Sequence, residues 1–199
     1  KTHVVNGSGV DIDKYSFTKL PESNINFLLV SRLLAEKGLR EYATAAKIVK
    51  EKFPYVTFDL VGAEDASLDA ISLEEVNSWS SYVNYNGSTN NVGQYIEKCH
   101  VYVLPSYHEG LPRSSLEAMS MGRPLITTDA VGCKETVHEG INGFMVPVGS
   151  TEKLAERMVW FIENAEKIQN MGEESRTIVE NKFDVRKVNK EMLKILGID

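Results

Sequence analysis

The sequence contains little of what marks several common protein classes. Only two of its 199 residues are cysteines, Cys99 and Cys133, which excludes a disulfide framework, and their spacing fits no metal site. We therefore expect reduced thiols in a reducing compartment. No apolar run approaches the roughly 18 residues that a transmembrane helix needs. The formal net charge of -6 argues against a general nucleic-acid-binding surface.

Several nucleotide-binding and catalytic motifs are also absent. No GxGxxG follows the first apolar run, no GxxxxGK[ST] occurs, and there is no GxSxG. Dinucleotide-binding, P-loop and α/β-hydrolase interpretations therefore lack the residues on which they depend. The four histidines, His3, His100, His108 and His138, are scattered without metal-ligand spacing. We expect each to be a surface or packing residue, and we expect no metal site.

Short apolar runs alternate with helical patterns along the whole chain. The expected strands are residues 27–31, 56–62, 82–87, 101–105, 124–129 and 143–148, after a strand fragment and turn in KTHVVNGSG. The expected helices are residues 39–53, 72–79, 92–99, 111–122 and 133–140, and two or three more at the carboxyl end, the first of them capped by Ser150. Ser72 and Glu75 form a capping-box pattern, and Pro112 is expected in the first turn of its helix. This alternation predicts one α/β domain with a doubly wound, six-stranded parallel sheet.

Ligands of such sheets bind at the carboxyl ends of the strands. That edge is expected to consist of residues 31–38, 62–69, 86–91, 106–112 and 127–134. The first of these loops carries Arg32 and Lys37. The planar guanidinium of Arg32 and the ammonium group of Lys37 could together bind a diphosphate. A pair of solvated surface cations explains these two residues equally well.

The fourth loop leads into a predicted helix whose N-terminus is suited to bind phosphate. Gly110 would permit close approach of a ligand to the backbone. Glu109 could contribute to a site, or it could simply complement the helix dipole. Arg113 would place a positive charge in the first turn, where the helix dipole is unfavourable to cations. Either its side chain is solvated, or an anion nearby compensates.

A second carboxylate, Glu117, follows Glu109 with seven residues between them. Because Glu109 belongs to the loop, both acids can border one cleft and accept the vicinal hydroxyls of a ribose or hexose. A glycosidase-type acid/base pair fits poorly, since those acids lie across a sugar from each other. The helix end and its basic neighbours instead favour phosphate binding.

Five segments carry a family resemblance in their order and spacing. They are VVNGSGVDIDKY, LLVSRLLAEKGL, YVNYNGSTNNVGQYI, VYVLPSYHEGLPRSSLEAMSMGRPLITTDAVGC and GINGFMVPVGS. Together they resemble the carboxyl-terminal domain of retaining GT-B glycosyltransferases of family four, over essentially all 199 residues. The spaced glutamate pair is the most specific part. NGSGVD and PRSSLEAMSMGRP are most similar to bacterial transferases that build capsule, O-antigen or protein-linked glycans on polyprenyl-diphosphate carriers.

The resemblance implies a catalytic role for Arg32, Lys37 and Glu109. The two cations match the basic pair that binds the donor diphosphate and stabilises the departing nucleotide without a metal. Glu109 matches the glutamate that contacts the transferred sugar, and Glu117 matches the one that holds the ribose hydroxyls.

The resemblance also implies contacts from two loops. Gly110, Leu111 and Pro112 match the loop whose backbone amides face the sugar and phosphates, and Arg113 lies beside them. Tyr85, Asn86 and Gly87 match the segment near the nucleotide base. Residues 61–72, VGAEDASLDAIS, are longer and more acidic than the family's glycine-rich loop, so the part of this loop in donor binding stays open.

The implied domain is a nucleotide-sugar-binding unit over residues 1–199. Residues 1–22 would be an inter-domain strand and linker, and residues 23–199 the core and carboxyl-terminal helices. We expect an amino-terminal acceptor domain to precede Lys1 in the full-length protein, and the fragment alone to be inactive.

The expected ligands and location follow from the same resemblance. We expect a UDP-sugar donor, no cofactor, no nucleic-acid partner, and a polyprenyl-linked glycan acceptor bound through the amino-terminal domain. The expected location is the cytoplasm, at the inner face of the cell membrane. A sugar-nucleotide epimerase half and a non-catalytic nucleotide-sugar-binding module remain alternatives; a phosphorylase lacks a suitable lysine context.

Overall fold

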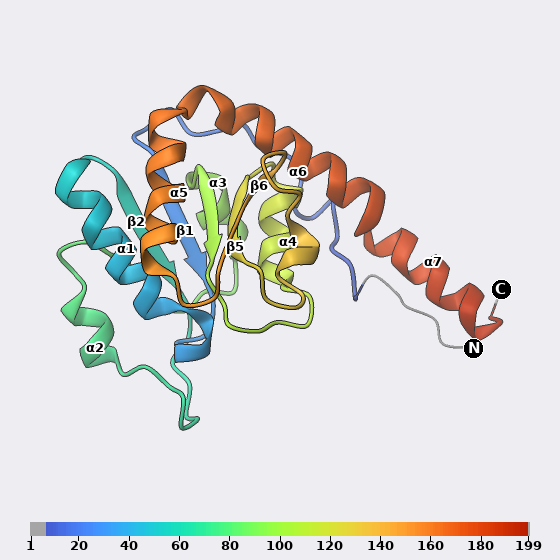
Figure 1. The fold of residues 1–199 in the computed structure, drawn as a ribbon. Coiled ribbons are helices and arrows are strands. Elements are labelled where there is room, and N and C mark those ends of the chain that lie inside the picture. The colour runs from blue at the N-terminus through green and yellow to red at the C-terminus, as the bar shows by residue number, and fades with distance from the viewer. Residues whose placement is uncertain (1–6, 199) are drawn as a thin grey trace.

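Six parallel strands form the centre of the molecule (Figure 1). The computed structural model describes residues 7–198, so the strand fragment expected in residues 1–5 lies outside the described residues. The sheet order is β3-β2-β1-β4-β5-β6, and every adjacent pair is parallel. The strands are β1 Asn26–Val30, β2 Thr57–Val61, β3 Asn84–Tyr85, β4 Val101–Leu104, β5 Leu125–Thr128 and β6 Gly143–Val146. The predicted doubly wound sheet is confirmed.

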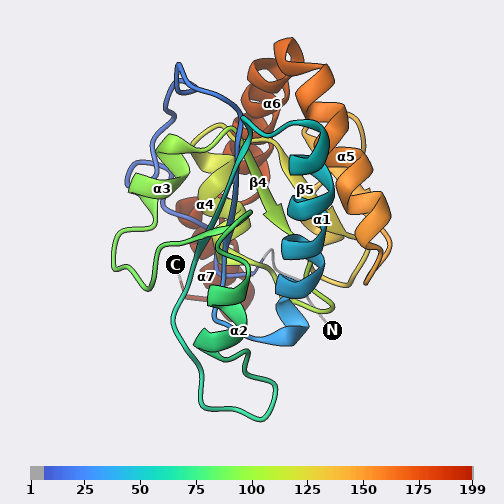
Figure 2. The same cartoon turned by 90° about the vertical axis from the view of Figure 1, so that its left-hand side faces the viewer.

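Helices cover both faces of the sheet (Figure 2). One face carries α1 (Leu39–Lys52) and α5 (Thr151–Glu163), and the other carries α3 (Gly93–Lys98), α4 (Arg113–Ser120) and most of α6 (Ile168–Lys182). Successive β1 residues point to opposite faces, as strand geometry requires. Phe27 and Leu29 therefore pack in the cluster under α1 and α5, whereas Leu28 packs in the cluster under α4.

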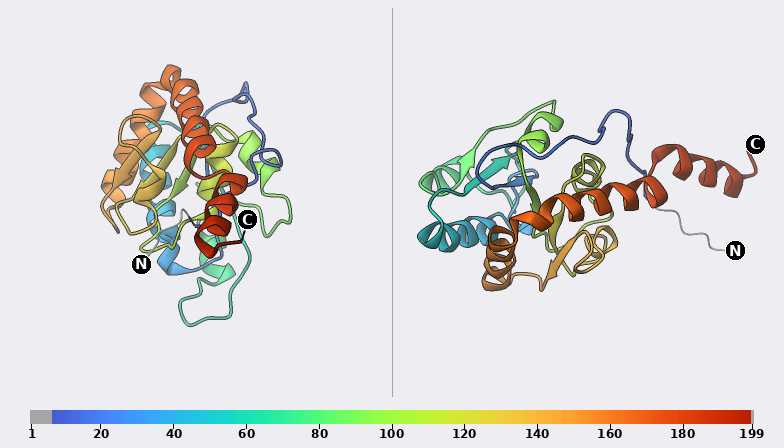
Figure 3. Two further views of the ribbon diagram at one scale, coloured as in Figure 1. Left: turned by 90° about the vertical axis from the view of Figure 1, so that its right-hand side faces the viewer. Right: turned by 90° about the horizontal axis from the view of Figure 1, so that it is seen from above.

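The remaining elements are short or peripheral. Helix α2 (Leu73–Ser78) begins at the predicted capping box, where the Ser72 hydroxyl accepts a hydrogen bond from the Glu75 amide at 3.2 Å. Helix α7 (Val185–Leu196) extends away from the sheet (Figure 3). Three 3-10 turns complete the described chain: η1 Ala35–Lys37, η2 Lys134–Thr136 and η3 Ala165–Lys167. Within residues 7–198, no helix is both long and apolar enough to cross a bilayer.

One predicted helix, over residues 133–140, is wrong. Only the turn η2 forms there, because the Asn142 side chain takes backbone groups that a helix would need. Its oxygen accepts from the His138 amide at 2.7 Å, and its nitrogen donates to the Thr136 carbonyl at 3.0 Å.

Two helix starts also differ in detail from the prediction. Pro112 is the N-cap of α4 and lies just before the first turn. Ser150 does stand at the N-cap of α5, but its side chain makes no capping hydrogen bond.

The order of the strands determines where a ligand can enter. Strands β1 and β4 are neighbours, but the connections that leave their carboxyl ends run to opposite faces of the sheet, through α1 and α4. Such a reversal opens a crevice at the carboxyl ends of the two central strands. The loops that follow β1 and β4 are those that carry the predicted cations and glutamates.

Candidate functional site

A cleft of about 370 Å³ lies at the carboxyl ends of β1, β2 and β4. Its walls come from the loops after these strands, the start of α4 and the segment before α3. The lining residues are Val30, Ser31, Arg32, Lys37, Val61, Gly62, Ala63, Ser88, Thr89, Val92, Leu104, Glu109, Pro112, Arg113, Ser114 and Glu117.

The structure brings six of the eleven predicted site residues to this cleft. They are Arg32, Lys37, Glu109, Pro112, Arg113 and Glu117. Gly110 and Leu111 are not among its lining residues, and neither are Tyr85, Asn86 and Gly87.

The end of β3 and the segment after it contact Gly62, which lines the cleft. The Tyr85 hydroxyl donates to the Gly62 carbonyl at 2.9 Å, and the Gly62 amide donates to the Gly87 carbonyl at 2.9 Å. The residues that reach the cleft are Ser88 and Thr89, which follow directly. The sequence did contain a signal for Ser88 and Thr89. Both carry hydroxyl groups and directly follow Gly87, which was expected to end a strand at the ligand-binding edge of the sheet.

Lys37 is paired with two carboxylates. Its Nζ lies 3.0 Å from Oε1 of Glu109 and 3.2 Å from Oε1 of Glu36. The side chains of Lys37 and Glu109 are only 14% and 19% exposed, so this ion pair is partly shielded from water. Burial lowers the pKa of Lys37, but the two acids outweigh burial and the net pKa is raised. Lys37 is therefore a cation at neutral pH. It is held near the carboxyl end of β4 by Glu109, from the loop that follows that strand.

Arg32 is held by the acidic loop that departs from the family pattern. Its Nη1 lies 2.6 Å from Oδ2 of Asp65, and its side chain is 63% exposed. Hydrogen bonds from Ser67, with the Arg32 contact, hold the pKa of Asp65 below its usual value. Asp65 thus orients one of the two predicted cations, a role that sequence reasoning missed because the contact spans 33 positions.

Glu117 lies on the second turn of α4 and is only 8% exposed. Burial raises its pKa, while the Tyr15 phenol, Arg113 and Lys14 act in the opposite direction. A buried carboxylate needs hydrogen-bond donors to remain ionised. Glu117 also lines the cleft, so hydroxyl groups of a ligand could supply such donors.

Comparison with known proteins assigns the family. A sequence model described as "Glycosyl transferases group 1" matches residues 24–164. This chain belongs to the group 1 glycosyltransferases. The family and the Rossmann-like fold predicted from the sequence are both confirmed.

Named relatives of this glycosyltransferase chain come from bacterial glycan assembly. It is 32% identical over 137 residues to the Campylobacter jejuni N,N'-diacetylbacillosaminyl-diphospho-undecaprenol alpha-1,3-N-acetylgalactosaminyltransferase, covering 69% of this chain and 35% of that protein. It is 27% identical over 196 residues to the Staphylococcus aureus capsular polysaccharide biosynthesis glycosyltransferase CapM, covering 93% and 51%. The chain therefore spans between a third and about half of these relatives.

A solved structure shares the fold over most of the chain. Anabaena Alr3699/HepE in complex with UDP superposes with a TM-score of 0.83 at 25% identity, over 95% of this chain and 56% of that one. Among residues 7–198, no three His, Cys, Asp or Glu side chains are grouped to hold a metal ion.

Gly132 controls where Glu109 lies in this glycosyltransferase chain. Its φ of +82° is in the left-handed region, and an added Cβ would overlap the carbonyl oxygens of Glu109 and Gly110. We expect Gly132→Ala to lower stability by more than the 1–2 kcal/mol of left-handed strain, or about 3 kcal/mol in all. The NMR signals of Lys37 and Glu109 should also move.

Gly140→Ala is the matched control. Gly140 has a similar φ of +74°, but nothing lies within 4 Å of the added Cβ. Urea denaturation and amide NMR spectra of the two variants therefore separate strain from overlap. Equal losses of stability in both variants, with no movement at Lys37 or Glu109, would contradict this account of the loop.

Proposed function

We propose that this chain is the donor-binding half of a bacterial glycosyltransferase that takes its sugar from a UDP-sugar. The observation that carries the proposal is the cleft itself, which is lined by the Lys37–Glu109 ion pair, by Glu117 and by the start of α4. This arrangement suits a ligand with hydroxyls at both ends and a diphosphate between them. The 25% identical HepE structure was solved with UDP, which supports the choice of nucleotide.

The proposed chemistry uses charge rather than an acid/base pair. As the bond between sugar and diphosphate breaks, negative charge grows on the leaving phosphate and positive charge on the sugar ring. Lys37, Arg32 and the N-terminal end of α4 would stabilise the departing diphosphate, without a metal. Glu109 would accept a hydrogen bond from the transferred sugar, and Glu117 would accept from the ribose. We propose that transfer retains the configuration of the sugar.

The acceptor in the proposal is a polyprenyl-linked glycan. The Campylobacter relative supports it, because its name describes an undecaprenol-diphosphate acceptor. The acceptor would bind a further domain of the full-length enzyme, which would work at the cytoplasmic face of the membrane. The named relatives are glycosyltransferases, which favours transfer over an epimerase half or a non-catalytic binding module.

Titration of the 199-residue chain with UDP tests the donor site. Amide NMR shifts detect weak binding, and we expect movement in residues that line the cleft. UMP should bind more weakly than UDP, since it lacks the phosphate that would meet Lys37 and the start of α4. A wild-type chain that binds neither nucleotide would overturn the proposal.

Glu117→Ala should weaken UDP binding by about 10- to 100-fold, the equivalent of losing hydrogen bonds to a charged group. The matched control is Glu51→Ala, because Glu51 is an exposed acid at the far end of α1. It should bind UDP like the wild type, at the same pH and ionic strength. Equal affinity of Glu117→Ala and the wild type would remove Glu117 from the site.

A further inference from the structure

One serine of the cleft has a buried tyrosine as its hydrogen-bond partner. Ser114 is the second residue of α4, and it lines the cleft together with Val30, the last residue of β1. The hydroxyl oxygen of Ser114 lies 2.7 Å from that of Tyr102, a fully buried residue of β4. The Tyr102 hydroxyl also lies 3.1 Å from the Val30 carbonyl oxygen. Tyr102 therefore joins two residues that line the cleft, one from β1 and one from the helix that follows β4.

The phenol of Tyr102 has one proton for these two oxygens. Burial raises the pKa of Tyr102 well above its usual value, so the phenol keeps its proton at neutral pH. A carbonyl oxygen only accepts, whereas a serine hydroxyl can both donate and accept. In one arrangement, Tyr102 donates to the Val30 carbonyl and Ser114 donates to the phenol oxygen. In the other, Tyr102 donates to Ser114, and the proton of Ser114 is free for an acceptor in the cleft.

The charges around Ser114 favour an anionic acceptor. Arg32, Lys37 and Arg113 line the same cleft. Glu117 follows Ser114 by three residues, so the two side chains are neighbours on one side of α4. A ribose held by Glu117 would therefore leave the Ser114 hydroxyl within reach of the phosphate that this ribose carries.

We propose that Ser114 is a further donor-binding residue whose hydroxyl donates to the diphosphate, and that Tyr102 positions this hydroxyl. When the anion enters the cleft, Tyr102 donates to Ser114, and Ser114 donates to a phosphate oxygen. The bond that is given up is the longer of the two, from Tyr102 to the Val30 carbonyl. The bond that is gained is stronger, because its acceptor is charged. The proposal rests on the proposed function, since the diphosphate belongs to the nucleotide sugar.

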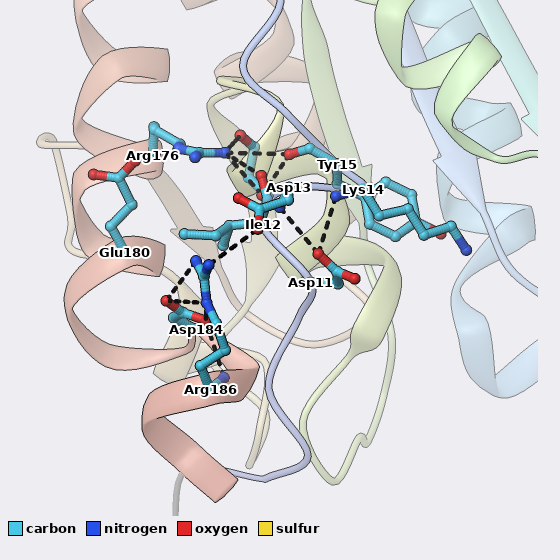
Figure 4. A network of polar contacts seen from close by, with 10 residues as sticks. Asp11, Ile12, Asp13, Lys14, Tyr15, Arg176, Glu180, Asp184 and Arg186 are labelled. Atoms are coloured by element: carbon cyan, nitrogen blue, oxygen red, sulfur yellow. Dashed lines mark hydrogen bonds and ion pairs between the residues drawn. The ribbon is translucent and has the colours of Figure 1, made fainter. Parts of the chain in front are cut away.

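The far end of α4 is held by contacts in which Ser114 takes no part (Figure 4). Arg176, on α6, donates through Nη1 to the Ser120 carbonyl at 2.8 Å. The same nitrogen donates to the carbonyls of Ile12 and Tyr15, each at 3.2 Å (Figure 4). The Ser120 hydroxyl donates to the Tyr15 carbonyl at 2.6 Å. Loss of one hydroxyl in the first turn should therefore leave α4 in place.

The UDP affinity of Ser114→Ala in the 199-residue chain tests the contact with the diphosphate. Measured by amide NMR shifts, the affinity should fall about tenfold, because one hydrogen bond to a charged phosphate is lost. Uridine carries no phosphate, so its affinity should be the same in the variant and the wild type. Equal losses for UDP and uridine would show that the substitution disturbs the whole cleft, and would overturn the proposal.

Ser115→Ala is the matched control. Ser115 is the next residue of α4 and is fully buried, and within residues 7–198 its hydroxyl has no hydrogen-bond partner. It is not among the residues that line the cleft. The control loses the same oxygen atom as Ser114→Ala and should bind UDP like the wild type. A loss of UDP affinity as large as that in Ser114→Ala would contradict a specific role of Ser114.

Tyr102→Phe tests the positioning role, because it keeps the Ser114 hydroxyl and removes its partner. UDP affinity should fall by less than in Ser114→Ala. Once Ser114 is alanine, Tyr102→Phe should cause no further loss, since no hydroxyl remains to be positioned. Independent losses that multiply in the double variant would remove Tyr102 from the proposal.

The same titrations separate this proposal from the proposed function. A wild-type chain that does not bind UDP overturns the proposed function, and the role of Ser114 with it. A wild-type chain that binds UDP no better than Ser114→Ala does leaves the donor site standing and overturns the role of Ser114 alone.

Discussion

Replacement of Arg123 by methionine is expected to lower the stability of this chain more than Gly132→Ala does. Arg123 is fully buried, with 0% of its surface exposed. Its five N–H groups make seven contacts within hydrogen-bond distance, some of them shared, and all to carbonyl or hydroxyl oxygens. Burial lowers the pKa of Arg123, because a charge away from water is poorly stabilised. The charge is tolerated because these oxygen dipoles surround it.

The seven contacts join three pieces of chain that are distant in sequence. They reach Thr18 and Lys19 before the sheet, Ile96 and Glu97 in α3, and the turn after α4. Methionine fills a similar volume but donates to none of these oxygens. The carbonyls of Ile96 and Met121 keep other donors, from the amides of Cys99 and Thr18, and each buried oxygen that stays unpaired costs about 1–3 kcal/mol. We expect a loss of about 4 kcal/mol or more, a large fraction of the 5–15 kcal/mol typical of a domain.

Urea denaturation followed by circular dichroism measures this loss. Arg40→Met is the control, because Arg40 is 52% exposed and its ion pair with Glu75 should contribute only about 0–1 kcal/mol. Arg123→Lys should fall between the two, since it keeps the charge but loses the planar fork. Equal urea midpoints for Arg123→Met and Arg40→Met would show that the buried network contributes little.

The fold was predictable because its signals are local. Each central strand is a short run of apolar residues. A strand that is buried on both faces can be recognised from such a run alone, without knowledge of the strands beside it. The helix expected over residues 133–140 failed for a reason that is also local but easily overlooked. Asn142 lies beyond the expected helix, and its side chain competes for the backbone groups at Thr136 and His138.

The lining of the candidate cleft was predictable where the sheet itself gathers residues. Lys37, Glu109 and Glu117 line one cleft because the loops after parallel strands, and the helices that these loops lead into, begin at one edge of the sheet. Contacts between distant segments gave no such signal. The hydrogen bonds from Arg123 to Thr18 span 105 positions, and the ion pair of Arg32 with Asp65 spans 33. Neither pattern has a period or a motif, so only the folded chain shows them.

Loss of Lys37 is expected to have the largest effect on catalysis. In the full-length enzyme, Lys37→Ala should lower kcat by about 100- to 1000-fold, the usual effect of removing a group that stabilises charge in the transition state. The reason lies in the ion pair with Glu109, where Nζ and Oε1 are 3.0 Å apart. A donor phosphate would draw Lys37 toward itself as the leaving group gains charge, and Glu109 would remain nearby to accept from the sugar.

Steady-state kinetics at varied donor and saturating acceptor concentration, with nucleotide release as the signal, distinguish this role from simple binding. An interaction made mainly in the transition state lowers kcat and kcat/KM together, whereas an interaction already present with the bound donor raises KM. Lys47→Ala is the matched control, because Lys47 is an exposed cation on α1 and should be silent in both constants. If Lys37→Ala raised KM alone, Lys37 would be a binding residue, and the stabilisation of the leaving diphosphate would fall to Arg32 and the N-terminal end of α4.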